Sequence, residues 1–100
     1  MMTFEQFRSE FEKCRSAAPS CQKWALSFTG EKGPDFGREW RVSARSNGHE
    51  AIMTVPSATF RLSDVPDYLA QLGTMLAEFD GDEAAGYAAR RAILSDFRRA

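Results

Sequence analysis

The sequence is poor in the residues on which catalytic and metal sites depend. Its 100 residues include one histidine and two cysteines, whereas a structural zinc site takes about four ligands. Cys14 and Cys21 are expected to be free thiols, because disulfides are rare in a reducing cytosol. No nucleophile and base stand in a recognisable catalytic arrangement. We therefore expect no metal, no cofactor and no enzymatic activity.

The chain also lacks a charge imbalance and a long apolar run. Thirteen basic and fourteen acidic residues give a formal charge of −1, so there is no general basic excess of the kind that nucleic-acid-binding domains carry. No apolar segment approaches the roughly 18 residues of a transmembrane helix, and the first residues do not resemble a secretory signal. We expect a cytoplasmic protein that does not associate with membranes.

Three segments have the three- to four-residue apolar spacing of helices that pack on a core. These segments are residues 3–18, 63–79 and 82–98. Thr3 and Gln6 predict a capping box at the first helix, and Pro19 cannot continue it. Ser63 or Asp64 is expected to cap the second helix. The third helix has acidic residues at its start and arginines at its end, as the helix dipole favours.

Between the first two helices, apolar and polar residues alternate as they do in strands with one buried face. Trp24–Thr29 and Trp40–Arg45 are two such strands, and Asn47-Gly48 predicts a two-residue hairpin turn into a third, which Pro56 ends. This turn fixes the pairing, so that Arg45 faces Glu50 across the two strands.

Two neighbouring segments have less regular patterns. Gly30–Arg38 contains three glycines and one proline, which predicts a long loop, and Ala58–Leu62 is expected to add a short fourth strand. The element order is then α-β-β-β-(β)-α-α. It indicates a single α+β domain over residues 1–100, a two-layer sandwich in which helices pack on a three-stranded antiparallel meander.

Basic side chains gather on the polar face of the predicted sheet and in the adjoining loop. Arg41 and Arg45 share that face, while Lys32, Phe36 and Arg38 lie in the loop. A solvated sheet face is one explanation. The other is a partner-binding surface, because arginine and aromatic residues anchor interfaces. On this basis we predict a small non-catalytic protein-binding module, an inhibitor or adaptor of a larger protein. Phage-borne inhibitors of bacterial defence, including anti-CRISPR proteins, are often single-domain chains of this size and ordinary composition.

The element order also resembles that of the double-stranded-RNA-binding domain. The matching stretches are Gly33-Pro34, Trp40-Arg41-Val42 and Asn47-Gly48, which are similar to the loop, second strand and turn of that family. The resemblance implies an RNA partner held by a lysine cluster at the start of the second helix. Here that stretch is Ser63–Asp67, which is acidic and repels phosphates. Because of the family resemblance, a nucleic-acid-associated protein is the alternative function; because of this acidic stretch, it is the second choice.

The last predicted helix has a sparser apolar stripe than the others. Its large apolar residues include Tyr87, Leu94 and Phe97, with alanines between them. Such a helix is either clamped at the edge of the domain or pairs with its twin in a homodimer.

Overall fold

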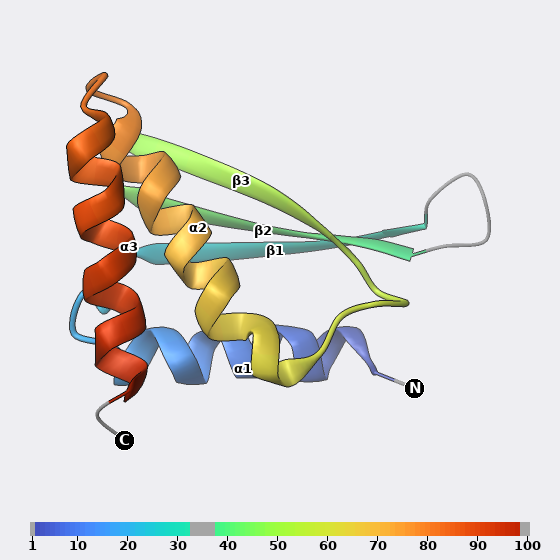
Figure 1. Ribbon diagram of the computed structural model, residues 1–100. Helices are drawn as coiled ribbons and strands as arrows, with labels where there is room; N and C mark the ends of the chain where they lie inside the picture. The colour runs from blue at the N-terminus through green and yellow to red at the C-terminus, as the bar shows by residue number, and fades with distance from the viewer. Residues whose placement is uncertain (1, 33–37, 99–100) are drawn as a thin grey trace.

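The structure is a computed structural model that describes residues 2–32 and 38–98. Its elements are α1 (Phe4–Ala17), β1 (Ala25–Lys32), β2 (Arg38–Ser46), β3 (His49–Pro56), a single 3₁₀ turn η1 (Leu62–Asp64), α2 (Val65–Glu78) and α3 (Glu83–Arg98). Figure 1 shows the helices on one side of the sheet, with α2 crossing it and α3 beside α2 at one end. The predicted α+β fold and element order are confirmed.

The sheet is an antiparallel meander in the order β1-β2-β3. Asn47 and Gly48 have φ angles of 52° and 81°, the left-handed values that a two-residue hairpin turn requires at both positions. Ser46 therefore pairs with His49, and Arg45 pairs with Glu50. The predicted pairing of Arg45 with Glu50 is confirmed.

Two expectations between the strands and helices were wrong. Gly30–Arg38 is not all loop, because β1 continues through Lys32 and β2 begins at Arg38, and these two residues pair with each other. Residues 58–62 form no fourth strand. The chain turns directly after Pro56, whose carbonyl accepts the Thr59 N–H at 3.3 Å.

Phe60, from the segment expected to be a strand, instead completes the core. It is 6% exposed, and its ring centroid lies 5.2 Å from that of Phe7 and 6.0 Å from that of Trp40. Phe7 and Phe11 reach the same cluster from α1. The burial of these rings holds α1 and the connection to α2 against one face of the sheet.

The helix ends follow the sequence closely. Thr3 and Gln6 form the predicted capping box of α1, and the Asp82 carboxylate accepts the Ala85 N–H at 3.1 Å at the start of α3. Asp64 precedes α2 but makes no side-chain capping bond. No helix in residues 2–32 and 38–98 is long and apolar enough to cross a membrane.

Candidate protein-interaction surface

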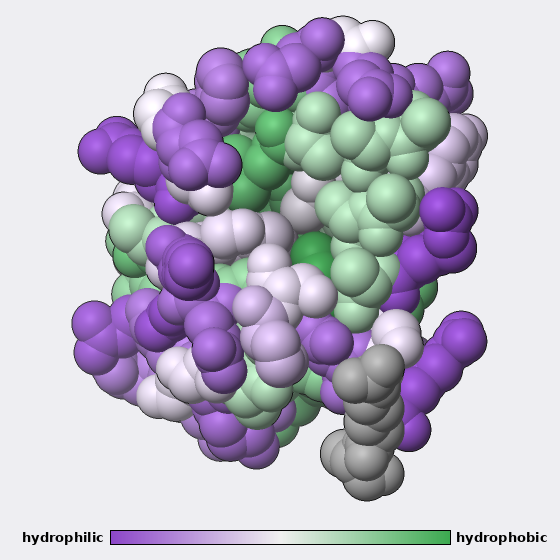
Figure 2. All heavy atoms as spheres, turned by 90° about the vertical axis from the view of Figure 1, so that its left-hand side faces the viewer, coloured by the Kyte–Doolittle hydropathy of each residue, from purple (hydrophilic) through white to green (hydrophobic). Residues whose placement is uncertain are grey.

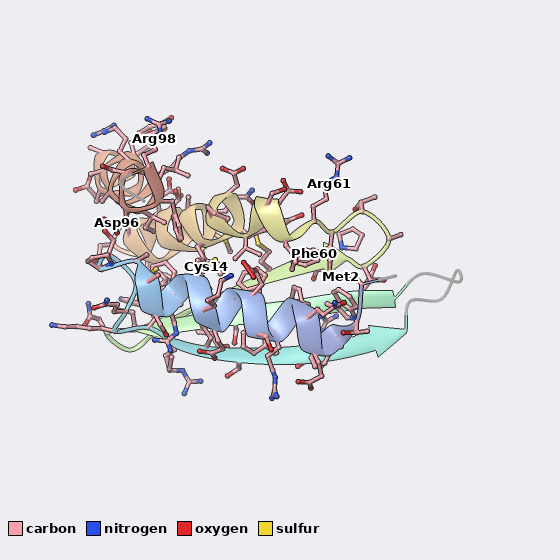
Figure 3. All side chains as sticks on the ribbon, turned by 90° about the horizontal axis from the view of Figure 1, so that it is seen from below. Met2, Cys14, Phe60, Arg61, Asp96 and Arg98 are labelled. Carbon is pink, nitrogen blue, oxygen red and sulfur yellow. The ribbon has the colours of Figure 1, made fainter. Side chains whose placement is uncertain are left out.

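The face of the sheet turned away from the helices has no helix over it. Figure 3 shows α2 above the strands and α1 in front of them, with no helix below the strands. The register sets the side chains of this bare side in four cross-strand rows. We call it the open face; its described side chains are Ala25, Ser27, Thr29, Glu39, Arg41, Ser43, Arg45, Glu50, Ile52, Thr54 and Pro56.

Arg41 and Arg45 are both exposed on β2, the central strand of the open face. Four residues of strand separate their Cα atoms by about 13 Å. Arg45 Nη2 lies 3.0 Å from Glu50 Oε2, and this side-chain pair is the predicted cross-strand ion pair. Because the Arg45 side chain is 68% exposed, solvent screens the pair, and it stabilises the fold by less than about 1 kcal/mol.

Ile52 is the large apolar side chain of the open face. It lies on β3 opposite Ser43 and is 53% exposed. Ile52 was not among the residues predicted to bind a partner, although the alternation of β3 already places it among polar residues. An exposed isoleucine between hydroxyl side chains and charged residues gives the open face both an apolar and a charged part.

The structure does not bring the other predicted partner-binding residues together with Arg41 and Arg45. Lys32 and Arg38 are register partners at the end of the β1–β2 ladder, rather than parts of a loop. Phe36 lies outside the residues that the structure describes. Arg41 and Arg45 are thus the two predicted residues that the structure places on the open face.

The two cysteines are free and buried beneath the end of α1. Burial, together with the neighbouring Glu10 carboxylate, raises the pKa of the Cys14 thiol to about 11. Burial likewise raises the pKa of Cys21 to about 11, together with the charge of Asp96. A thiol is nucleophilic as the thiolate, so neither side chain is activated at neutral pH.

The single histidine joins the hairpin turn to the end of α2. The His49 ring stacks on Phe79 with centroids 4.7 Å apart and planes 6° from parallel, and its Nε2 lies 3.8 Å from Asp80 Oδ1. Both interactions are near the surface. Among the described residues, no three His, Cys, Asp or Glu side chains lie close enough together to hold a metal ion.

The outer surface of α3 is the second region proposed from the sequence. Figure 2 shows a column of small apolar side chains along this helix, with hydrophilic groups beside it. Of the predicted dimer residues, Tyr87 is 57% exposed, whereas Leu94 and Phe97 pack partly against the core. The helix is therefore clamped to the domain through most of its large apolar residues.

No family model matches the chain, and no curated protein or solved structure matches it significantly. The class is thus defined by the structure alone. The chain is a small α+β domain in which helices cover one face of an antiparallel sheet and leave the other open.

Proposed function

We propose that this chain is a non-catalytic protein-binding module, an inhibitor or adaptor of a larger protein, and that the open face contacts the partner. The observation that carries this proposal is the placement of Arg41, Arg45 and the exposed Ile52 on one uncovered sheet face. Arginine is enriched among the residues that dominate binding energy. A paired sheet also holds its side chains in fixed positions, so little order is lost on binding.

The open face carries charges of both signs. Arg41 and Arg45 lie on it together with Glu39 and Glu50, and Arg45 pairs with Glu50, so its described charges balance. Complementary charge speeds the encounter and selects the partner more than it raises affinity. A protein surface that offers apolar contact to Ile52 and charges of both signs is therefore the target that fits this face.

A phosphate backbone is the alternative target, and the second helix argues against it. The start of α2 carries Asp64 and Asp67, and no basic residue lies between Ser63 and Tyr68. Duplex RNA held at the start of α2, as the resemblance to the double-stranded-RNA-binding domain implies, would meet two carboxylates. The elevated pKa of Cys14 and Cys21 further supports a role without nucleophilic catalysis.

Capture from a bacterial lysate, with and without nuclease, tests the proposal. The tagged full chain should retain one protein in stoichiometric amount after nuclease treatment. Recovery that collapses with nuclease would overturn the proposal in favour of nucleic-acid binding. Affinity measured against salt concentration gives a second criterion, because each phosphate contact that releases a counterion steepens the loss of affinity.

A further inference from the structure

The outer edge of β1 offers unpaired backbone groups. In a two-residue hairpin the residues that flank the turn, here Ser46 and His49, form a hydrogen-bonded pair, and such pairs alternate along the strands. Across the β1–β2 ladder, this alternation directs the N–H and C=O groups of Leu26, Phe28 and Gly30 away from β2. No other strand of the described chain pairs with this edge.

A groove runs along the same edge, between β1 and α1. It has a volume of about 420 Å³, within the range of roughly 300–1,000 Å³ found for ligand sites. The lining residues are Phe4, Arg8, Ser9, Glu12, Leu26, Ser27 and Phe28. Phe4, Leu26 and Phe28 are only partly buried, so the lining has exposed apolar area beside the unpaired backbone of β1.

The charges of this α1–β1 groove are already balanced. Arg8 Nη2 lies 3.0 Å from Glu5 Oε2, and Arg15 Nη2 lies 2.9 Å from Glu12 Oε2. A groove that is lined by apolar groups and paired charges suits an uncharged segment better than an acidic or phosphate-bearing one.

Most of the β1 edge lacks the residues that usually keep a strand edge unpaired. Residues 25–30 include no charged residue and no proline, two direct protections of an edge strand, and the charged residues of β1, Glu31 and Lys32, lie at its end. The opposite edge of the sheet, β3, carries Glu50 near its start and Pro56 at its end. Residues 25–30 of β1 are therefore the segment of this edge that suits a further strand.

The position of α1 limits what can bind there. Figure 1 shows α1 on the far side of β1 from β2, and Figure 3 shows it in front of the sheet, so the helix overhangs the edge. A second copy that paired antiparallel through its own β1 would be related by a two-fold axis perpendicular to the sheet, so its overhanging α1 would meet the α1 of the first copy.

We propose that the outer edge of β1 binds an extended, uncharged segment of the partner protein, which adds to the sheet as a strand under α1. Backbone bonds to Leu26, Phe28 and Gly30 would supply affinity, and apolar side chains at alternate positions would enter the groove. This inference rests on the proposed function, because it takes a protein as the partner. A strand added at β1 would also enlarge the area of contact with the partner. The open face spans only about 14 by 24 Å, which is less area than the roughly 800 Å² that each partner buries in a stable interface.

A phage-displayed library of random twelve-residue peptides tests this site. Peptides selected on the full chain should carry apolar residues at alternate positions. Their synthetic forms should shift the amide NMR signals of Leu26, Phe28 and Gly30 and slow the hydrogen exchange of these amides. Ser9→Trp fills the groove from the exposed side of α1 and should weaken binding at least tenfold. Ser16→Trp, the matched change outside the groove lining, should leave affinity within twofold of the parent.

Peptides that are methylated at the backbone nitrogens facing β1 test the same bonds without changing the protein. They should bind at least tenfold more weakly than the unmethylated forms. The proposal is overturned if no peptide is selected, if Ser9→Trp and methylation leave binding unchanged, or if the free chain sediments as a dimer with its β1 amides protected. Arg41→Glu/Arg45→Glu should bind these peptides normally, so a failure of the groove and a failure of the open face are distinguishable.

Discussion

Gly73 sets how closely α3 approaches α2. A Cβ at this position would lie 2.4 Å from Ile93 Cδ1 and 3.3 Å from Trp24 Cη2, and Ile93 is 1% exposed. In Gly73→Ala the isoleucine must move inside a packed core, which costs about 1–3 kcal/mol. Alanine recovers about 1 kcal/mol of helix propensity. We expect a net fall of about 1 kcal/mol in the free energy of unfolding.

Gly86→Ala is the matched control in the partner helix. Its added Cβ would lie 2.7 Å from Glu78 Oε1, but Glu78 is exposed and its side chain can swing into solvent. The gain in helix propensity from alanine is then not offset by a cost in packing. We expect Gly86→Ala to raise the free energy of unfolding by up to about 1 kcal/mol.

Urea unfolding of the two variants and of a double-mutant cycle with Ile93→Val decides the point. Valine lacks the Cδ1 atom that the new methyl group meets, so Gly73→Ala should cost at least about 0.5 kcal/mol less in the Ile93→Val background. The packing argument is refuted if the two substitutions are additive within about 0.3 kcal/mol, or if Gly73→Ala stabilises the protein as Gly86→Ala does.

Three further predictions concern stability. Thr3→Ala removes the oxygen that accepts the Gln6 N–H at 3.1 Å. In urea unfolding this variant should lose about 1 kcal/mol of the free energy of unfolding, while Thr3→Ser, which keeps the oxygen, should be as stable as the parent. Gly48→Ala should lower the free energy of unfolding by about 1 kcal/mol through backbone strain, because φ is 81°. A steric clash does not contribute, since no atom lies within 4 Å of the added Cβ. A loss below about 0.3 kcal/mol would contradict left-handed strain at this position. Burial raises the pKa of Cys14 and Cys21 from 9.0 to about 11, so the folded chain holds these protons where the unfolded chain releases them. Stability then falls between pH 9 and 11, by about 1.4 kcal/mol for each thiol at pH 10, and Cys14→Ala/Cys21→Ala should lose this part of the pH dependence.

Local rules were enough to predict the register of the hairpin and the start of α1. The Asn47-Gly48 turn leaves one pairing of β2 with β3, which puts Trp40, Val42 and Ala44 on the same side as Val55, Met53 and Ala51. The capping box of Thr3 and Gln6 likewise depends on residues three apart in the sequence. Residues that are close together in the sequence determine both features, so both could be predicted without the structure.

The features that depend on packing were not predictable in the same way. Phe60 lies in a segment with strand-like composition, yet the space between Phe7 and Trp40 draws it into the core as part of a turn. The α1–β1 groove depends on how far α1 overhangs β1, and no local pattern in the sequence specifies that offset. The exposure of Ile52 could have been predicted from the alternation of β3, because every second residue of a half-buried strand faces solvent.

The most direct test of the open face compares two charge-reversed variants in the same capture experiment. Arg41→Glu/Arg45→Glu alters the open face, while Arg90→Glu/Arg91→Glu makes the same change in charge at two exposed positions of α3. Circular dichroism first establishes that both variants are folded. The account predicts that the first variant loses the captured protein at least tenfold and that the second retains it. Equal retention of the partner by both variants would contradict the account.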